Sequence, residues 1–124
     1  MTTFTPAFAV LDGKLCRLAR NGSINAAHLP LATAVIEFSP GPLRLYVRES
    51  PYGLLPGVPN LYCLDLDFRM LWLAEWPLPL DPCGRIVEEV DDALTVESVS
   101  GAVVRLESST GRVLPSRSAV AAAV

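Results

Sequence analysis

The 124-residue chain has few of the residues from which most active sites are built. It contains one histidine, His28, and three cysteines separated by 46 and 19 residues, Cys16, Cys63 and Cys83. A nucleophilic triad needs a base, and the single histidine has no Ser or Cys motif around it. The cysteine spacing fits neither a zinc pair nor a C-x-x-C redox motif. We therefore expect no catalytic residue, no metal site and no cofactor. We interpret His28 as a loop or packing residue and the cysteines as buried free thiols.

Positive charge and long apolar runs are scarce as well. Ten basic residues, with Lys14 the sole lysine, face thirteen acidic ones, and they are scattered rather than grouped. This pattern predicts no nucleic-acid surface. Apolar runs reach five or six residues, too short for a membrane-spanning helix. A secretory signal has a cation before its apolar run, and no cation precedes the apolar run at 7–11. We expect a cytoplasmic protein that does not enter a membrane.

What the chain does have is hydrophobicity broken at short intervals. Apolar residues make up 51% and charged residues 19%, a composition typical of one folded domain. Eleven prolines and eight glycines leave few stretches long enough for a helix and favour antiparallel strands. We predict a single all-β domain over 1–115 and a frayed tail over 116–124, where a short helix is the alternative.

The expected strands alternate with turn residues. They cover 8–11, 14–20, 32–38, 43–49, 60–66, 69–75, 85–90, 93–99, 101–108 and 112–114. Asp12-Gly13 predicts a type I′ hairpin turn, because both positions need a positive φ. Strict alternation over 43–49 predicts a half-buried strand, whereas apolar residues on both faces of 60–66 and 69–75 predict central strands covered on each side.

One segment occurs three times. The copies begin at Leu15, Leu61 and Val103 and align without gaps, apart from one extra residue in the turn of the third. Leu18, Leu64 and Leu106 then occupy equivalent places. The offsets of 46 and 42 residues agree with the roughly 40–50 residues of a propeller blade.

The middle copy, 60–72, resembles the blade motif of PQQ-like (quinoprotein-type) β-propellers. Trp72 matches the docking tryptophan and Asp65 the acidic turn position, while Phe68 stands where glycine is expected. The segment 105–113 resembles the next blade and keeps the glycine, Gly111, but lacks the tryptophan. The stretch 29–77 is also similar to short uncharacterised bacterial proteins with two to three such units.

The resemblance implies antiparallel meanders that form two to three propeller-blade-like sheets, with the tryptophan wedged between neighbouring blades. Closed propellers have four or more blades, so we do not expect this chain to close a propeller by itself. The repeat does not imply a quinone cofactor, which needs a whole ring of blades around it.

Two functions follow as hypotheses. The leading one is a non-catalytic protein-interaction or binding module, whose partner is an unknown protein or a second copy that pairs the exposed sheet edges. The alternative is a small-ligand-binding or enzymatic domain with a pocket near the Pro- and Gly-rich loop 50–59, formed by Arg48, Tyr52 and Trp76. A third interpretation is a folded piece of a larger propeller. The acidic residues of 88–92 are interpreted as a solvated hairpin.

Overall fold

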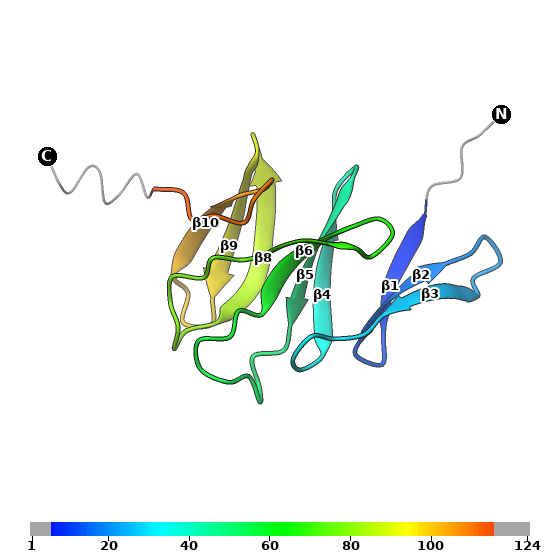
Figure 1. Cartoon of the computed structure of the whole chain (residues 1–124), viewed down its shortest axis with the longest axis horizontal. Helices are drawn as coiled ribbons and strands as arrows, with labels where there is room; N and C mark the ends of the chain where they lie inside the picture. The colour runs from blue at the N-terminus through cyan, green and yellow to red at the C-terminus, as the bar shows by residue number, and fades with distance from the viewer. Residues whose placement is uncertain (1–5, 116–124) are drawn as a thin grey trace, which may run out of the picture.

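The computed structural model describes residues 6–115, which form ten strands in three antiparallel meander sheets, none of them closed (Figure 1). The first sheet contains β1 (Ala7–Leu11), β2 (Lys14–Leu18) and β3 (Ile24–His28). The central sheet contains β4 (Val35–Pro40), β5 (Arg44–Glu49), β6 (Leu61–Asp65) and β7 (Met70–Leu73). The third sheet contains β8 (Cys83–Val90), β9 (Ala93–Ser98) and β10 (Val103–Glu107). The all-β prediction is confirmed, and the predicted tail at 116–124 lies outside the described residues.

Two tight turns have the backbone that their residues favour. Asp12 and Gly13, between β1 and β2, have φ values of 52° and 73°. Asp91 and Asp92, between β8 and β9, have φ values of 51° and 64°. Consecutive left-handed residues define the type I′ turn, in which aspartate and glycine are the preferred residues. The acidic pair of the second turn therefore has a local structural role.

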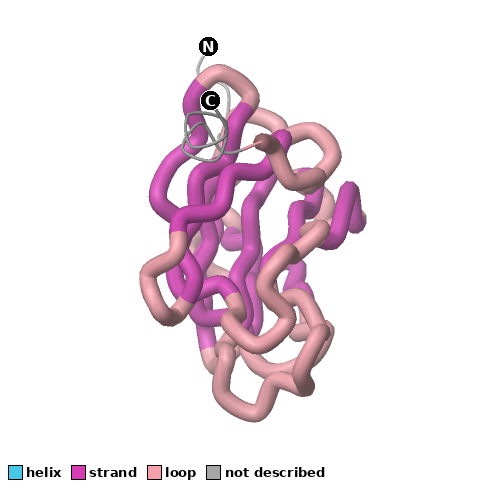
Figure 2. The backbone as a smooth tube through the Cα atoms, turned by 90° about the vertical axis from the view of Figure 1, so that its left-hand side faces the viewer, coloured by secondary structure: helices cyan, strands magenta, loops and turns pink. Residues whose placement is uncertain are grey.

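The sheets follow one another in chain order, and the central sheet lies between the other two (Figure 1). We call the face of a sheet that points to the following sheet its leading face, and the opposite face its trailing face. One hydrophobic cluster joins the leading face of the first sheet to the trailing face of the central sheet. A second cluster joins the central and third sheets in the same sense. In the view of Figure 2, the strands run along the molecule and loops gather at its lower end.

This stacking explains where the strand predictions were wrong. Leu45, Tyr46 and Val47 are all buried, so β5 is covered on both faces rather than half-buried, because each face meets a neighbouring sheet. The prediction of a central strand holds for β6 but not for β7, an edge strand whose Met70, Leu71 and Leu73 are 45–49% exposed. Strand β3 was not predicted, because its sequence Ile-Asn-Ala-Ala-His has weak strand propensity and forms by pairing with β2.

The threefold sequence repeat is a repeated strand-turn-strand unit. In each copy the repeated leucine pairs with the first residue after the turn: Leu18 with Ile24, Leu64 with Met70, and Leu106 with Val113. The next residue donates its N–H across the turn: Ala19 to Ser23, Asp65 to Arg69, and Glu107 to Arg112, at 2.8–2.9 Å. Each turn also contains one left-handed residue: Gly22, Phe68 and Gly111. The predicted equivalences are thus present in the backbone.

Trp72 fills the contact between the central and third sheets. Its ring is buried, and its Nε1–H donates to the carbonyl oxygen of Ser108 at 2.9 Å. A Cβ atom on Gly111 would lie 2.4 Å from Cε3 of that ring, so the glycine is needed both for its φ of +75° and for the space it leaves.

At the contact between the first and central sheets, the large and the small residue are exchanged between these two repeat positions. Ala26 stands in the repeat where Trp72 stands, and Phe68 stands where Gly111 stands. The Phe68 ring centroid lies 5.9 Å from that of Phe8 and 6.1 Å from that of His28, across the leading face of the first sheet. At this pair of repeat positions, each contact therefore has one large aromatic ring, which comes from the preceding sheet at one contact and from the following sheet at the other. This exchange explains why phenylalanine occupies a glycine position with a φ of +67°.

At the first contact, a hydrogen bond from Arg17 takes the place of the bond that Trp72 donates to Ser108 at the second contact. At the first contact, Nη1 of Arg17 donates to the carbonyl oxygen of Leu66 at 3.2 Å, and Leu66 is the repeat equivalent of Ser108. The same guanidinium nitrogen lies 3.1 Å from Oδ1 of Asp67. The first and the central sheet thus each bind the turn of the following sheet through a side-chain N–H donor.

A Gly111→Ala variant tests the role of this glycine. We expect it to lose about 3 kcal/mol or more of unfolding free energy, because left-handed strain of about 1–2 kcal/mol adds to the collision with Trp72. Gly57→Ala is the matched control, since Gly57 has a φ of +81° and nothing lies within 4 Å of the position that its Cβ would take. Urea denaturation measures both variants, and equal losses would contradict the proposed packing role.

A double-mutant cycle tests the exchange of sizes. Ala26→Trp should overpack the first contact, and Phe68→Gly should leave a void there, so each variant alone should lower stability. The double variant recreates the Trp–Gly pair of the second contact. We expect its loss to be smaller than the sum of the single losses by about 1 kcal/mol or more. Additive losses in urea denaturation would show that the two positions do not share one space.

Candidate functional site

A buried polar network joins the first and central sheets. The hydroxyl of Tyr62 on β6 donates to Oε2 of Glu49 on β5 at 2.5 Å, and Nε2 of His28 on β3 lies 2.7 Å from the same hydroxyl. Since the tyrosine proton is directed to the carboxylate, His28 carries its proton on Nε2 in this arrangement. The three residues are far apart in sequence and meet because the two sheets stack.

Glu49 also holds the segment that connects these sheets. Its carboxylate accepts the backbone N–H groups of Leu31, Ala32 and Thr33 at 2.7–3.0 Å. Burial by itself raises the pKa of a carboxyl group, but the Tyr62 hydroxyl and these three N–H donors outweigh burial and lower the pKa of Glu49. The buried carboxylate is therefore ionised and fully bonded.

The other two members of the network stay in their neutral forms. Burial lowers the pKa of His28, opposed by the nearby charge of Glu49, and burial together with Glu49 raises the pKa of Tyr62. A tyrosine kept protonated beside a carboxylate is a hydrogen-bond donor and not a nucleophile. The arrangement connects the sheets, in agreement with the interpretation of His28 as a packing residue.

The pKa of Glu49 predicts acid sensitivity. The stability that its ionised form contributes is complete above the ordinary pKa of 4.5 and is lost as the pH falls through the lower value of the folded state. We expect Glu49→Gln to lower the unfolding free energy at pH 7 by about 1–3 kcal/mol, because the amide places an N–H group among donors. The deficit should shrink below pH 4.5. Denaturation at several pH values measures it, with the exposed Glu88→Gln as control, and a pH-independent deficit would contradict the assignment.

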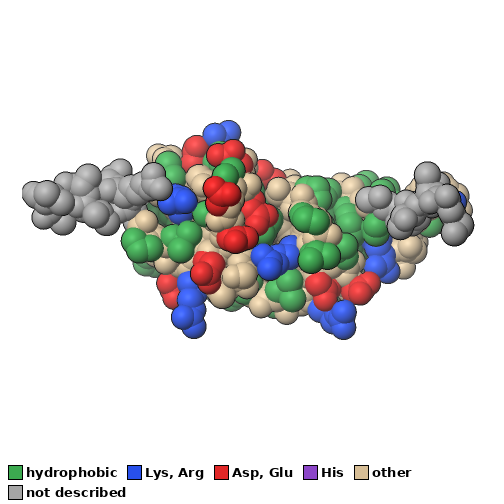
Figure 3. Space-filling view, turned by 90° about the horizontal axis from the view of Figure 1, so that it is seen from above, with side chains coloured by type: hydrophobic (Ala, Val, Ile, Leu, Met, Phe, Trp, Pro, Cys, Tyr) green, Lys and Arg blue, Asp and Glu red, His purple; other side chains and the backbone are tan. Residues whose placement is uncertain are grey.

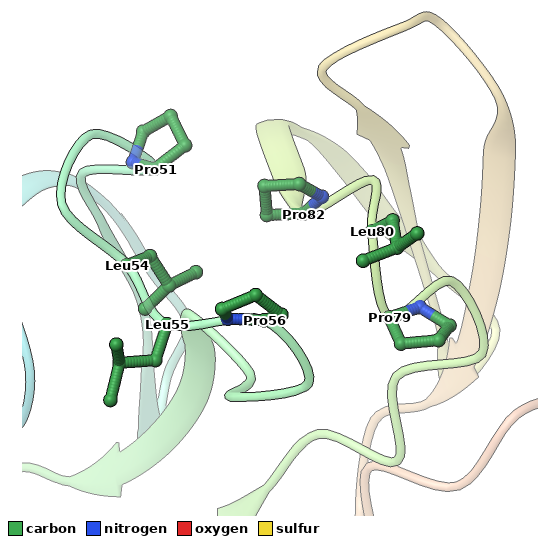
Figure 4. Close-up of a pocket in the computed structure, with 7 residues that line it drawn as sticks. All are labelled: Pro51, Leu54, Leu55, Pro56, Pro79, Leu80 and Pro82. Atoms are coloured by element: carbon green, nitrogen blue, oxygen red, sulfur yellow. The ribbon is translucent and has the colours of Figure 1, made fainter.

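An apolar groove of 230 Å³ lies between two loops at one end of the central and third sheets (Figure 4). The loop that follows β5 and the loop that precedes β8 form its two walls. The first wall consists of Pro51, Leu54, Leu55 and Pro56, and the second of Pro79, Leu80 and Pro82.

Asn60 fixes the bases of both loops. It is buried, and its Nδ2 donates to the carbonyl oxygens of Glu49 at 2.8 Å and Cys83 at 2.9 Å. Its Oδ1 accepts the N–H of Cys83 at 2.9 Å. Nearer the groove, the N–H of Gly57 donates to the carbonyl oxygen of Pro79 at 3.1 Å. The spacing of the two walls is therefore set by hydrogen bonds.

None of the three residues predicted from the sequence lines this groove. Nε of Arg48 lies 2.6 Å from Oε1 of Glu37, on the neighbouring strand β4 of the same sheet. Trp76 packs against the cluster between the central and third sheets, and its Nε1–H donates to the carbonyl oxygen of Asp81 at 2.9 Å. Tyr52 is 87% exposed beside Pro51. The groove lies beside the loop 50–59, and residues other than Arg48, Tyr52 and Trp76 line it.

The groove residues carried a signal that the sequence analysis missed. Leu54, Leu55 and Leu80 are leucines in loops that contain several prolines. A leucine in such a loop has no strand to place it in the core, so it either folds back on the sheets or lines a surface. Leu55 and Leu80 are 71% and 83% exposed.

A second pocket, of 180 Å³, lies by the β4–β5 and β8–β9 turns and has a mixed apolar and polar lining. It includes Arg44, Tyr46, Glu89 and Asp92. Burial and the neighbouring Glu89 raise the pKa of Tyr46, and Nη1 of Arg44 donates to the carbonyl oxygen of Ser108 at 3.0 Å. Acidic side chains gather on this side of the molecule, left of centre in Figure 3. The Tyr46 hydroxyl forms hydrogen bonds with the side chains of Glu89 and Arg44.

The remaining candidates for chemistry are buried or dispersed. Cys16, Cys63 and Cys83 are buried free thiols, as expected, and burial raises the pKa of Cys63 and of Cys83 to about 12. Within residues 6–115, no group of three or more His, Cys, Asp or Glu side chains could hold a metal ion. The same part of the chain contains no helix of the length and hydropathy that a membrane span requires.

No protein-family model, no curated protein and no solved structure matches this chain.

Proposed function

We propose that the protein is a non-catalytic interaction module of the cytoplasm, built from propeller-blade-like sheets of the PQQ-like type, and that the apolar groove receives side chains of a partner protein. The groove between loops 50–59 and 77–82 carries this proposal. The threefold repeat and the Trp72–Gly111 contact support the blade-like interpretation.

The size of the groove favours a side chain over a metabolite. Pockets for drug-sized ligands have volumes of roughly 300–1,000 Å³ and place a few polar groups among apolar ones. This groove measures 230 Å³, and its seven lining side chains are all proline or leucine. They offer no acid, base or nucleophile for catalysis. We therefore prefer a protein partner to the alternative of a small-ligand or enzymatic site at loop 50–59.

The prolines define how a partner would bind. Pro51, Pro56, Pro79 and Pro82 have no N–H group, so these wall positions cannot donate to an added β-strand. Recognition then depends on burial of apolar side chains in a preorganised groove, which limits the conformational entropy lost on binding. Leu55, Leu80 and the neighbouring Tyr52 are the exposed groups that a partner would remove from water.

Selection of binders from a random peptide library displayed on phage tests the proposal. We expect the selected peptides to share one or two large apolar residues and to lose at least tenfold in affinity for a Leu80→Asp variant. Leu43→Asp is the matched control, because Leu43 is likewise exposed, at 75%, but lies at the β4–β5 turn. Peptides that bind Leu80→Asp as tightly as the wild type, or a selection without enrichment, would count against the groove.

A further inference from the structure

The two contacts between the sheets have the same arrangement. Within residues 6–115, two sheet faces have no neighbouring sheet: the trailing face of the first sheet and the leading face of the third. In each contact, the leading face of one sheet covers the trailing face and the turn of the next. By this rule the trailing face of the first sheet could accept a preceding sheet, and the leading face of the third sheet could cover a following one. Among the described residues, no further sheet fills either position.

The trailing face of the first sheet has the character of the two trailing faces that are already covered. Its residues are apolar, at the positions that are also apolar in the central sheet: Ala9, Cys16, Leu18 and Ala27, equivalent to Val47, Tyr62, Leu64 and Leu73. Ala27 is exposed, Ala9 and Leu18 are half-buried, and Cys16 is buried. Its turn contains Gly22 with a φ of +85°, the counterpart of Gly111. Nothing lies within 4 Å of a Cβ placed on Gly22, whereas the site at Gly111 holds the ring of Trp72.

The leading face of the third sheet carries the counterparts of residues that make the inner contacts. Val103 is 65% exposed, but its equivalents Leu15 and Leu61 are fully buried. Arg105 is the equivalent of Arg17, which binds the turn of the central sheet through Leu66 and Asp67.

A cross-strand ion pair also recurs on this face. Nη2 of Arg85 lies 3.0 Å from Oε2 of Glu97, and the two residues are paired in the sheet. The equivalent pair on the leading face of the central sheet is Glu37 with Arg48, where acid and base are interchanged. There the glutamate also accepts the N–H of Ile86 of the third sheet at 3.2 Å, so such a pair is compatible with a covered face.

We propose that the protein self-associates head to tail, with the leading face of the third sheet of one copy on the trailing face of the first sheet of another. Val103 would occupy the place of Leu61, and Arg105 would reach the turn 19–22 as Arg17 reaches the turn of the central sheet. Two copies would contribute six sheets, within the roughly four to eight blades of closed propellers. The contact joins two different surfaces, so the two copies form a closed ring when the rotation between them permits a second, identical contact. The inference does not depend on the groove.

Two surface variants, mixed, test the contact. Ala27→Arg places a charge on the accepting face of the exposed edge strand β3, and Val103→Asp places one on the covering face. Sedimentation velocity at millimolar protein should give twice the monomer mass of 13.3 kDa for the wild type and the monomer mass for each variant alone. Their mixture should form pairs, since it contains one intact copy of each face. These pairs should dissociate more readily than the wild type, because one contact replaces two.

Three outcomes would overturn the proposal. A wild type that remains monomeric has no such contact. A Val103→Asp variant that pairs with itself as the wild type does would show a symmetric contact between first sheets instead. A mixture that remains monomeric would show that the two faces do not bind each other. Thermal denaturation of both variants, with Leu43→Asp as a control elsewhere on the surface, confirms that the fold is retained in the comparison.

Discussion

The structure depends on one constraint: the central sheet has two apolar faces, and both must be covered. Neighbouring residues of β5 and β6 alternate between the two hydrophobic clusters, so neither face can be left in water without a large loss of buried apolar area. The first and third sheets supply the cover. At the contact with the third sheet the Trp72 ring fills the space left by Gly111, and at the contact with the first sheet the Phe68 ring packs with Phe8 and His28. The large ring therefore comes from the preceding sheet at one contact and from the following sheet at the other.

Buried polar groups then determine how the connecting loops leave this stack. Glu49 accepts the N–H groups of the segment between the first and central sheets, and Asn60 joins the bases of the two loops that line the groove. Such groups are stable in the interior because each has its hydrogen-bond partners. The groove is therefore an extension of the core hydrogen bonding, and its rigid proline walls suit the recognition of apolar side chains. The stack itself ends in two unlike faces, which gives the molecule a direction.

Much of the fold could be predicted from the sequence, and less of the groove. The turn Asp12-Gly13, the alternating strands and the threefold repeat are local patterns, and they predicted most strands and the equivalence of Leu18, Leu64 and Leu106. The loop 50–59 was recognisable from its prolines and glycines. Arg48 and Trp76 were assigned to its surface because of their residue types, yet Arg48 pairs with Glu37 of the same sheet and Trp76 packs against the core between the central and third sheets.

The sequence by itself determined the strand class, the turn positions and the period of the repeat, because these depend on residues within a few positions of one another. The tertiary structure alone decided which faces are covered, since β5 alternates as a half-buried strand does and is nevertheless buried on both sides. It also decided that His28, Glu49 and Tyr62 meet, and that Phe68, with a positive φ, packs against Phe8 and His28 of the first sheet. Contacts of this kind join residues of different sheets, and their energies depend on packing in three dimensions rather than on sequence spacing.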